Sequence, residues 1–272
     1  KNEGDLSENY RPGSILCCFF KLYEKFLLDK IKPFIDTFLS RYMSAYRENH
    51  STNHVLIRLT ESWRNALDNN KLVGTVLMDL SKAFDCIPHD LLVAKLYMYG
   101  FSENSITFFY SYLKRRVQCV KINEICSTSK TLLSGVPQGS ILGPILFNIF
   151  LNDMITVINK TDIYNFADDN TLSVIAENRD KILNVLCQES ELAVNWFKEN
   201  SMIVNPDKFQ SMILDKQDKN NISSELNISG NKIKTKESVK LLGISIDNQL
   251  KFDTRVSNLS KQASMQLNAI SR

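Results

Sequence analysis

Apolar residues recur every three or four positions along much of the chain, the spacing that places them on one face of an α-helix. Residues 14–39 show this spacing but contain Pro33, and a proline inside a helix removes a backbone hydrogen bond. We therefore expect two helices in that segment, with a break at Pro33. The same spacing predicts further helices over residues 55–67, 88–99, 104–114, 145–158, 178–200 and 254–270.

Other apolar stretches lack helical spacing and predict strands. Residues 72–80 form an almost continuous apolar run with β-branched members, which is typical of a buried strand. Two short apolar segments, 163–167 and 171–175, flank a polar tripeptide at 168–170 and predict a hairpin with a tight turn. Helices mixed with hairpins in this order indicate an α+β fold with an antiparallel sheet. Further strands are expected over residues 117–122, 131–133, 211–214 and 241–246, with a turn at 123–124 and a polar loop at 216–224.

The composition is that of an ordinary globular chain of 272 residues, 43% hydrophobic and 23% charged. It excludes collagen-like, low-complexity and wholly disordered architectures. Six scattered cysteines without a Cys-x-x-Cys pair, and three histidines, offer no zinc-site spacing. The polar N-terminus lacks a signal peptide and an initiator Met, and the longest apolar stretch, 141–151, is too short to span a bilayer. We expect a soluble intracellular chain, cytoplasmic or nuclear, that is a piece of a longer protein.

The net charge of +3 is unevenly distributed along the chain. Residues 230–272 hold eight basic and three acidic side chains, a net charge of +5, so the rest of the chain carries −2. A basic segment is often only a solvated surface, but it also attracts the phosphates of a nucleic acid. Charge alone leaves both interpretations open.

Acidic residues stand where two predicted strands end. Asp79 lies at the end of the strand predicted over 72–80, and Asp168 and Asp169 lie in the turn of the predicted hairpin. Adjacent carboxylates repel one another unless a positive charge neutralises them. If the two strands are neighbours, Asp79 and Asp168 converge at one sheet edge and suit hard divalent cations such as Mg²⁺. The competing interpretation is an ordinary turn stabilised by side-chain hydrogen bonds.

Two further segments have a composition that suits ligand binding. Residues 134–144 form a loop of small residues ahead of a helix, which lets backbone and a polar side chain approach a planar or anionic ligand. A generic connecting loop explains the same composition. Phe84 lies five residues beyond Asp79. By residue type it belongs in a core, although its bulk would also serve as a wall against a nucleotide sugar.

These three segments, in this order, resemble palm motifs A, B and C of reverse transcriptases, and the set is similar to that of non-LTR (LINE-type, jockey-like) retrotransposons. Four flanking segments are similar to the fingers motifs and to motifs D and E of the same family. The resemblance covers almost the whole chain, and seven segments in order are very specific. The matching residues are 76–85 (A), 134–140 (B), 166–169 (C), 9–12 and 46–52 (fingers), 205–208 (D) and 240–244 (E).

The resemblance implies the site residues. Asp79, Asp168 and Asp169, with the backbone carbonyl of Leu80, would hold two Mg²⁺ ions, with Mn²⁺ as an alternative. Lys208 would donate a proton to the leaving pyrophosphate, unless it is an ordinary surface lysine. Phe84 would select dNTPs over rNTPs. The nucleotide-binding set would be Arg11, Arg47, Leu80, Lys82, Ala83, Phe84, Gln138 and Gly139, and the primer grip would be Leu241, Leu242 and Gly243.

The same resemblance implies a right-hand polymerase fold with an antiparallel palm sheet. The implied function is RNA-directed DNA polymerase, whose partners would be an RNA template, a DNA primer and dNTPs, with no membrane. The expected domains are fingers (1–72), palm with motif A (73–100), a fingers/palm insertion (101–133), palm with motifs B to E (134–250) and the start of a thumb (251–272).

The chain also departs from the family pattern in the fingers motifs. Gly13 and Ser14 follow Arg-Pro where the family usually has Ile-Ser, and Glu48 and Asn49 stand where it usually has a basic residue and a glycine. A carboxylate at Glu48 would repel a triphosphate. A second interpretation therefore stays open, a catalytically decayed or truncated retroelement fragment that only binds nucleic acid. An unrelated metal-binding hydrolase is a third.

Overall fold

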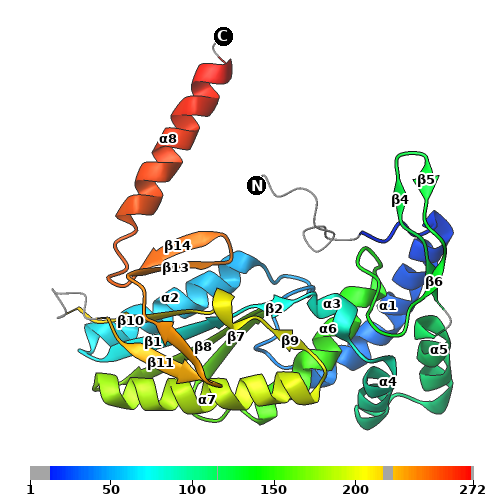
Figure 1. Ribbon diagram of the computed structural model, residues 1–272, viewed down its shortest axis with the longest axis horizontal. Coiled ribbons are helices and arrows are strands. Elements are labelled where there is room, and N and C mark those ends of the chain that lie inside the picture. Colours follow the sequence, from blue (N-terminus) through cyan, green and yellow to red (C-terminus); the bar gives the residue numbers. More distant parts are fainter. Residues whose placement is uncertain (1–12, 115, 217–222, 271–272) are drawn as a thin grey trace.

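The computed structural model describes residues 13–114, 116–216 and 223–270, and its centre is a four-stranded antiparallel sheet (Figure 1). β1 pairs with β8 on one side and with β10 on the other, so it lies inside the sheet. This position explains why six of its seven residues are buried and why its sequence is apolar throughout. The α+β prediction with an antiparallel sheet is thus confirmed. The strand order is β10 (Gln210–Leu214), β1 (Leu72–Met78), β8 (Asp169–Ala176), β7 (Asp162–Phe166).

Helices cover both faces of this sheet. On one face α7 (Arg179–Glu199) packs against β1 and β8, next to α6 (Leu142–Leu151), which is almost entirely buried. Gly74 permits the close approach of α7, because a Cβ at this position would lie 2.1 Å from Ile182 Cγ2. On the other face α2 (Thr52–Asp68) buries Trp63, whose indole N–H donates to Ser173 Oγ over 2.8 Å. The hairpin of β13 (Ser238–Leu241) and β14 (Ile244–Asp247) packs beside α2.

The first helix, α1 (Cys18–Phe38), is continuous, so the predicted break at Pro33 is wrong. Glu24 before the proline and Ile35 after it are both completely buried. The helix therefore gains burial on both sides of Pro33, which outweighs the loss of one backbone hydrogen bond. The proline itself lies on the exposed side of the helix.

The other predicted helices are present, with shifted ends. The helix predicted over 145–158 begins earlier, because Pro144 lies in the first turn of α6, where its missing N–H costs nothing. It ends at Leu151, and η2 (Asn152–Thr156), a 3-10 helix, follows. The short helix α3 (Ala83–Cys86) was not predicted. The remaining predicted helices are α2, α4 (His89–Met98), α5 (Glu103–Leu113), α7 and α8 (Asp253–Ile270).

Hairpins account for the other strands. The hairpin predicted between residues 117 and 133 turns at Asn123, as expected, and its strands are short and exposed. The single strand predicted over 241–246 is wrong, because Leu242 and Gly243, at φ 47° and 81°, turn the chain between β13 and β14. The strands are β3 (Val117–Gln118), β4 (Lys121–Ile122), β5 (Ile125–Cys126), β6 (Lys130–Thr131), the pair β2 (Leu80–Ser81) and β9 (Ile203–Val204), and an unpredicted hairpin of β11 (Glu225–Ile228) and β12 (Asn231–Lys234).

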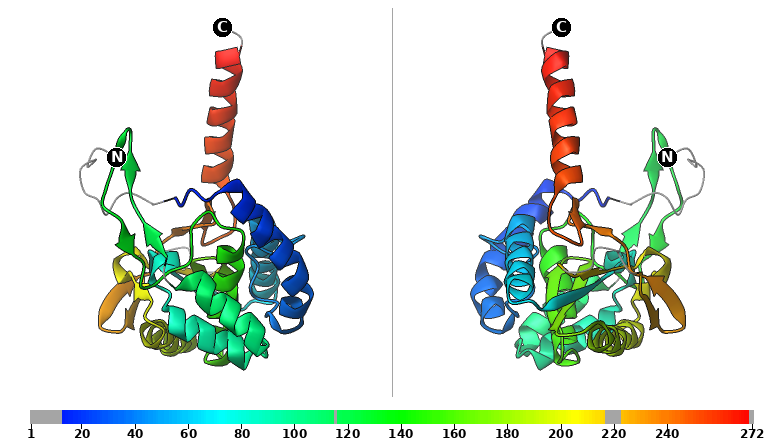
Figure 2. Two further views of the ribbon diagram at one scale, coloured as in Figure 1. Left: turned by 90° about the vertical axis from the view of Figure 1, so that its right-hand side faces the viewer. Right: turned by 90° about the vertical axis from the view of Figure 1, so that its left-hand side faces the viewer.

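Two elements project from the same side of the body, α8 and the 117–131 hairpin (Figure 2). The side chains of α8 from Val256 to Ala269 are all exposed. Among the residues described here, no helix combines the length and the apolar character that crossing a membrane requires.

Candidate functional site

The ends of β1 and β8 bring Asp79 and Asp169 level with each other. In the β1–β8 register Met78 faces Asn170, so Asp79, the next residue along, lies beside Asp169, the first residue of β8. Asp168 precedes it in the two-residue turn between β7 and β8. The strands that carry the three carboxylates are therefore neighbours.

Two buried asparagines hold the turn between β7 and β8. Asn165 Nδ2 donates to Asn170 Oδ1 over 2.6 Å and to the carbonyl of Ala167 over 3.2 Å. Asn170 Nδ2 donates in turn to the carbonyl of Asp168 over 3.0 Å. Ala167 has φ 57°, which alanine rarely adopts, so these bonds enforce the turn. The turn is thus Ala167-Asp168 instead of the predicted 168–170, since Asp169 already belongs to β8.

Lys208 lies against Asp79. Oδ2 of Asp79 is shielded from solvent and accepts no hydrogen bond, and the ammonium Nζ of Lys208 lies 3.0 Å from it. Lys208 ends the 3-10 helix η3 (Pro206–Lys208), and Asn205 before it donates its N–H to the carbonyl of Asp79 over 3.2 Å. The segment that carries Lys208 is therefore anchored to the strand end that carries Asp79. The lysine side chain is 62% exposed, so the ion pair is open to solvent on the Lys208 side and shielded on the Asp79 side.

A cavity of about 310 Å³ opens beside these residues. Asp79 and Asp169 line it from the sheet, Lys208 from η3, and Lys236 and Lys240 from the segment before β13 and from β13 itself. Sequence reasoning did not single out Lys236 and Lys240. Their signal in the sequence was the excess of basic residues after position 230.

The carboxylate oxygens at this site are of the chemical type that binds a hard divalent cation. Carboxylate oxygens are the ligands that Mg²⁺ prefers, and the shielded Oδ2 of Asp79 already has a positive charge beside it, on Lys208. Within the described parts of the chain, no three Asp, Glu, His or Cys side chains gather closely enough to hold a metal ion. Asp79 and the Asp168-Asp169 pair thus lie at the neighbouring ends of β1 and β8 without converging on one point, as expected for like charges.

The loop 134–144 is locked at its beginning to the segment after β1. A Cβ on Gly135, whose φ is 86°, would lie 2.8 Å from Asp85 Cα, so this close contact requires glycine. His89 Nε2 donates to the carbonyl of Gly135 over 2.8 Å. Burial lowers the pKa of His89 and raises that of Asp85, which favours the neutral form of both.

The middle of the loop lies against the segment before α1. The N–H of Ser14 donates to the carbonyl of Gln138 over 2.8 Å, and a Cβ on Gly139 (φ 104°) would lie 2.9 Å from the Ser14 carbonyl oxygen. Ser140 Oγ then accepts from the N–H of Gly143 over 2.8 Å and caps the start of α6. Backbone contacts with Ser14 thus hold Gln138 and Gly139, and the side chain of Ser140 ties the next residue to α6.

Phe84 is half-buried at the start of α3. Its ring stacks on that of Phe147, with centroids 4.2 Å apart, and meets Tyr46 edge-on at 6.1 Å. Beside it Ala83 is buried, and Lys82 is exposed with φ 49°. The core and wall interpretations of Phe84 are therefore compatible, since one face of the ring is covered and part of the side chain remains accessible.

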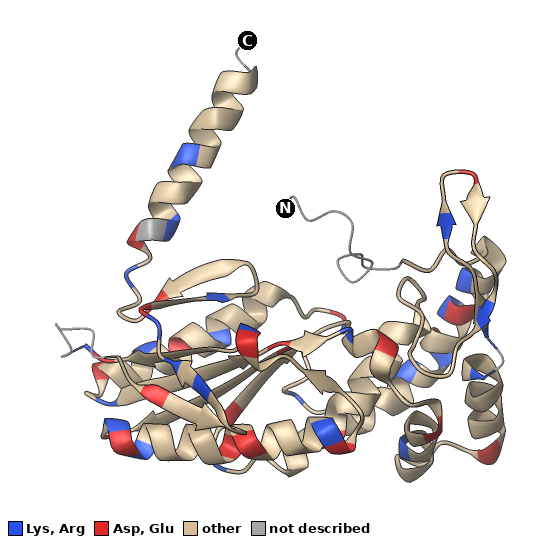
Figure 3. Ribbon diagram, viewed as in Figure 1, with Lys and Arg blue, Asp and Glu red and all other residues tan. Residues whose placement is uncertain are grey.

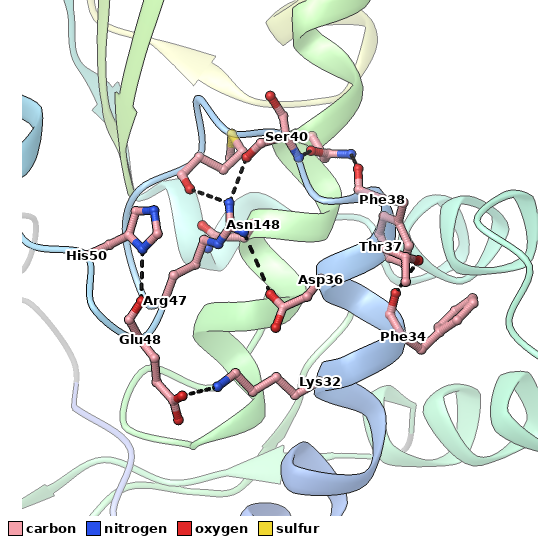
Figure 4. Close-up of polar contacts among 12 residues, drawn as sticks. Lys32, Phe34, Asp36, Thr37, Phe38, Ser40, Arg47, Glu48, His50 and Asn148 are labelled. Atoms are coloured by element: carbon pink, nitrogen blue, oxygen red, sulfur yellow. Dashed lines mark hydrogen bonds and ion pairs between the residues drawn. The ribbon is translucent and has the colours of Figure 1, made fainter. Parts of the chain in front are cut away.

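Arg47 is held by the turn that follows α1 (Figure 4). Its guanidinium donates to the carbonyls of Ser40 and Met43 over 2.9 and 3.3 Å and lies 3.8 Å from Asp36 Oδ1. The side chain is 17% exposed, so Arg47 serves the local structure in this conformation. Glu48 forms an ion pair with Lys32. The other expected fingers residue, Arg11, lies outside the described residues.

The expected primer-grip residues form the tip of the β13–β14 hairpin. Leu241 is buried in the core against α2, Leu242 is half-buried, and Gly243 is exposed. The N–H of Lys240 donates to Gln210 Oε1 over 3.2 Å, which ties the hairpin to the start of β10. The hairpin thus lies at the edge of the same cavity as Asp79 and Asp169.

Known proteins share both the sequence pattern and the fold of this chain. The family described as reverse transcriptase (RNA-dependent DNA polymerase) matches residues 1–246. Among curated Drosophila melanogaster proteins, the probable RNA-directed DNA polymerase from transposon BS is 26% identical over 254 residues, and the RNA-directed DNA polymerase from mobile element jockey is 24% identical over 263. The alignments cover 90% and 93% of this chain and 28% of each relative, so the chain spans just over a quarter of their length.

The fold is also found in a solved telomerase structure. Apo telomerase from Candida tropicalis, truncated from its C-terminal domain, superposes with a TM-score of 0.57 over 86% of this chain and 45% of that one, at 16% sequence identity. The TM-score shows that the two chains share a fold, and at this identity the similarity shows the fold alone.

Proposed function

Because the chain belongs to the reverse transcriptase (RNA-dependent DNA polymerase) family, we propose that it carries the polymerising part of a longer RNA-directed DNA polymerase. It adds dNTPs to the 3′-hydroxyl of a DNA primer opposite an RNA template. The observation that supports this most directly is the meeting of Asp79 with Asp169 at neighbouring strand ends, with Lys208 in contact with Asp79. Such a group of charges suits phosphoryl chemistry.

The carboxylates of Asp79, Asp168 and Asp169, with the backbone carbonyl of Leu80, are the residues that would hold two Mg²⁺ ions, with Mn²⁺ as an alternative. When bound, such ions lower the pKa of an attacking hydroxyl and neutralise charge on the phosphates. Lys208 is exposed and placed to turn from Asp79 toward the leaving pyrophosphate, to which it donates a proton.

Nucleotide selection belongs to the residues around the loop 134–144. Gln138 and Gly139, fixed by backbone contacts, pack against the incoming nucleotide and the template base. Phe84, with Lys82 and Ala83 beside it, excludes a 2′-hydroxyl by its bulk. Arg47 reaches the triphosphate only after releasing Ser40 and Asp36, so fingers closure is coupled to a rearrangement of that turn.

We assign the parts of a right-hand polymerase by the order of the motifs and by the shared telomerase fold. The central sheet and its carboxylates are the palm, and the hairpin tip Leu241-Leu242-Gly243 is the primer grip. The assigned ranges are fingers 1–72, palm 73–100, a fingers/palm insertion 101–133, palm 134–250 and the start of a thumb 251–272.

Primer extension on an RNA template with Mg²⁺ tests this function. We expect the wild-type chain and an Asp162→Ala variant to extend the primer, and Asp168→Ala to lose extension. Asp162 is a matched control, since it is an exposed aspartate at the opposite end of β7. Equal extension by wild type and Asp168→Ala would remove the carboxylates from the mechanism. Binding of template and primer without incorporation by the wild type would instead favour a fragment that only binds nucleic acid.

A further inference from the structure

Glu24 is a completely buried carboxylate on a helix that is otherwise largely exposed around it. Its Oε1 accepts a hydrogen bond from the hydroxyl of Tyr112 over 2.5 Å, and its Oε2 accepts one from the N–H of Ile141 over 2.8 Å. Burial of a carboxylate is costly unless its oxygens are paired, so the chain tolerates Glu24 here because both partners are in place. One side chain thus joins α1, α5 and the start of α6 (Figure 1), and aromatic rings of α1 also contact rings of α5, Phe20 with Tyr112 and Tyr23 with Phe108.

The bond from Ile141 places this carboxylate at the N-terminus of α6. Ile141 is the N-cap residue of that helix and has no capping side chain of its own. Ser140 satisfies the N–H of Gly143, and Glu24 satisfies the N–H of Ile141. A negative charge at a helix N-terminus also interacts favourably with the helix dipole. Glu24 is therefore a charged cap that reaches α6 from a distant part of the sequence.

Two neighbouring side chains, Tyr112 and Arg116, stabilise the buried carboxylate of Glu24. Burial raises the pKa of Tyr112 well above its usual value, and the bond to Glu24 raises it further, so the hydroxyl keeps the proton that it donates. The guanidinium of Arg116 lies near both groups, and its Nη1 is shielded from solvent without a hydrogen-bond partner. A positive charge at this distance offsets part of the cost of burying the carboxylate.

We propose that Glu24 is a positioning residue for nucleotide binding, which holds the start of α6 and thereby sets the place of Gln138 and Gly139. This role rests on the proposed function, in which those two residues contact the incoming nucleotide. The register of β1 and β8 places Asp79 beside Asp169, and this placement does not depend on Glu24. Loss of the charge therefore affects nucleotide affinity and leaves the chemical step largely unchanged.

The test compares Glu24→Gln with Glu189→Gln in the full chain. Glu189 is a matched control, because it is 2% exposed and its Oε2 accepts the N–H groups of Asn159 and Lys160 over 2.7 and 2.8 Å, away from the loop. Two measurements are made, the dNTP KM and kcat of primer extension, and amide hydrogen exchange over residues 134–144 without nucleic acid. We expect Glu24→Gln to raise KM about tenfold with little change in kcat, and to speed exchange over 138–143. Glu189→Gln leaves KM and exchange in the loop as in the wild type.

Each alternative outcome is decisive. An unchanged KM in Glu24→Gln overturns the proposed role. The role is also overturned if both variants show the same rise in KM and the same fall in kcat, which is the result that a merely structural role produces. If the wild type extends no primer, the proposed function fails and the nucleotide role of Glu24 fails with it. Loop exchange then still decides whether Glu24 holds the loop: acceleration in Glu24→Gln but not in Glu189→Gln shows that it does, and no acceleration shows that it does not. If Glu24→Gln does not fold, Tyr112→Phe tests the same role in milder form, because it removes one donor and keeps the ring.

Discussion

At the scale of single residues, the proton donation proposed for Lys208 is the most testable role, because its ammonium lies 3.0 Å from Asp79 and its side chain is largely exposed. Replacing it by glutamine removes both the positive charge and the transferable proton. We expect Lys208→Gln to lower kcat about 100-fold, the usual worth of a positioned general acid. Single-nucleotide incorporation under saturating dNTP measures this directly. Lys71→Gln, an exposed lysine before the opposite end of β1, is the control, and an unchanged kcat in Lys208→Gln would contradict proton donation.

The placement of the carboxylates was predictable residue by residue because its signal is local. Asp79 follows an apolar strand, and Asp168 and Asp169 lie between two others, so their position at neighbouring strand ends follows from a few adjacent residues. Lys236 and Glu24 carry no such signal. Lys236 lines the cavity from the segment between the unpredicted β11–β12 hairpin and β13, and the partners of Glu24 lie far along the chain. Contacts that tertiary packing creates between distant segments cannot be predicted from the local sequence.

At the scale of elements, the loop 134–144 depends on glycine at Gly135. Its φ of 86° and a Cβ position 2.8 Å from Asp85 Cα combine backbone strain with a clash against backbone. We expect Gly135→Ala to lower the free energy of unfolding by about 2–4 kcal/mol. Gly230→Ala is a matched control, because its φ is 81° but nothing lies within 4 Å of its Cβ position. Urea denaturation compares them, and equal losses would show that the clash is relieved.

A second element, the link into α8, is held by Asp247. Its carboxylate accepts the N–H groups of Gln249, Lys251 and Phe252 over 3.1, 3.0 and 2.7 Å. Burial acts to raise the pKa of Asp247, but these donors outweigh it and hold the pKa below its usual value. The stabilisation is therefore present at neutral pH and is lost as the pH falls through the folded pKa.

We expect Asp247→Asn to cost about 1 kcal/mol of unfolding free energy at pH 7, and this difference from the wild type to shrink below about pH 4. Urea denaturation at pH 7 and pH 3 measures it. Asp253→Asn, at an exposed aspartate in the first turn of α8, serves as the control. A difference that persists undiminished at pH 3 would exclude the ionised carboxylate as its source.

Element types were easier to predict than element ends, and two corrections show why. A proline predicts a break, yet α1 passes through Pro33 because the helix is buried on both sides of it. An apolar run predicts one strand, yet Leu242 and Gly243 turn the chain within it, since Leu241 and Ile244 can then pair. In both segments packing against the rest of the molecule overrode the local preference.

At the scale of the whole molecule, the uneven charge along the sequence bears on which face of the molecule binds nucleic acid. The basic segment after residue 230 passes the cavity and continues into α8, whereas α7 covers the opposite side of the sheet and carries basic residues near both of its ends (Figure 3). If the proposed function is correct, phosphate groups of the template–primer duplex lie on the cavity side. The lysines there should then account for more of the binding than lysines on α7.

Salt dependence of template–primer binding distinguishes these faces. We expect the double variant Lys236→Gln/Lys240→Gln to reduce the slope of log Kd against log salt concentration by about 2, one unit for each phosphate that is no longer neutralised. The matched double variant Lys181→Gln/Lys198→Gln removes the same charge from exposed positions of α7 and should leave the slope close to that of the wild type. Equal slopes for the two double variants would mean that the duplex responds only to net charge. A reduction confined to the α7 variant would place the duplex on the other side of the sheet.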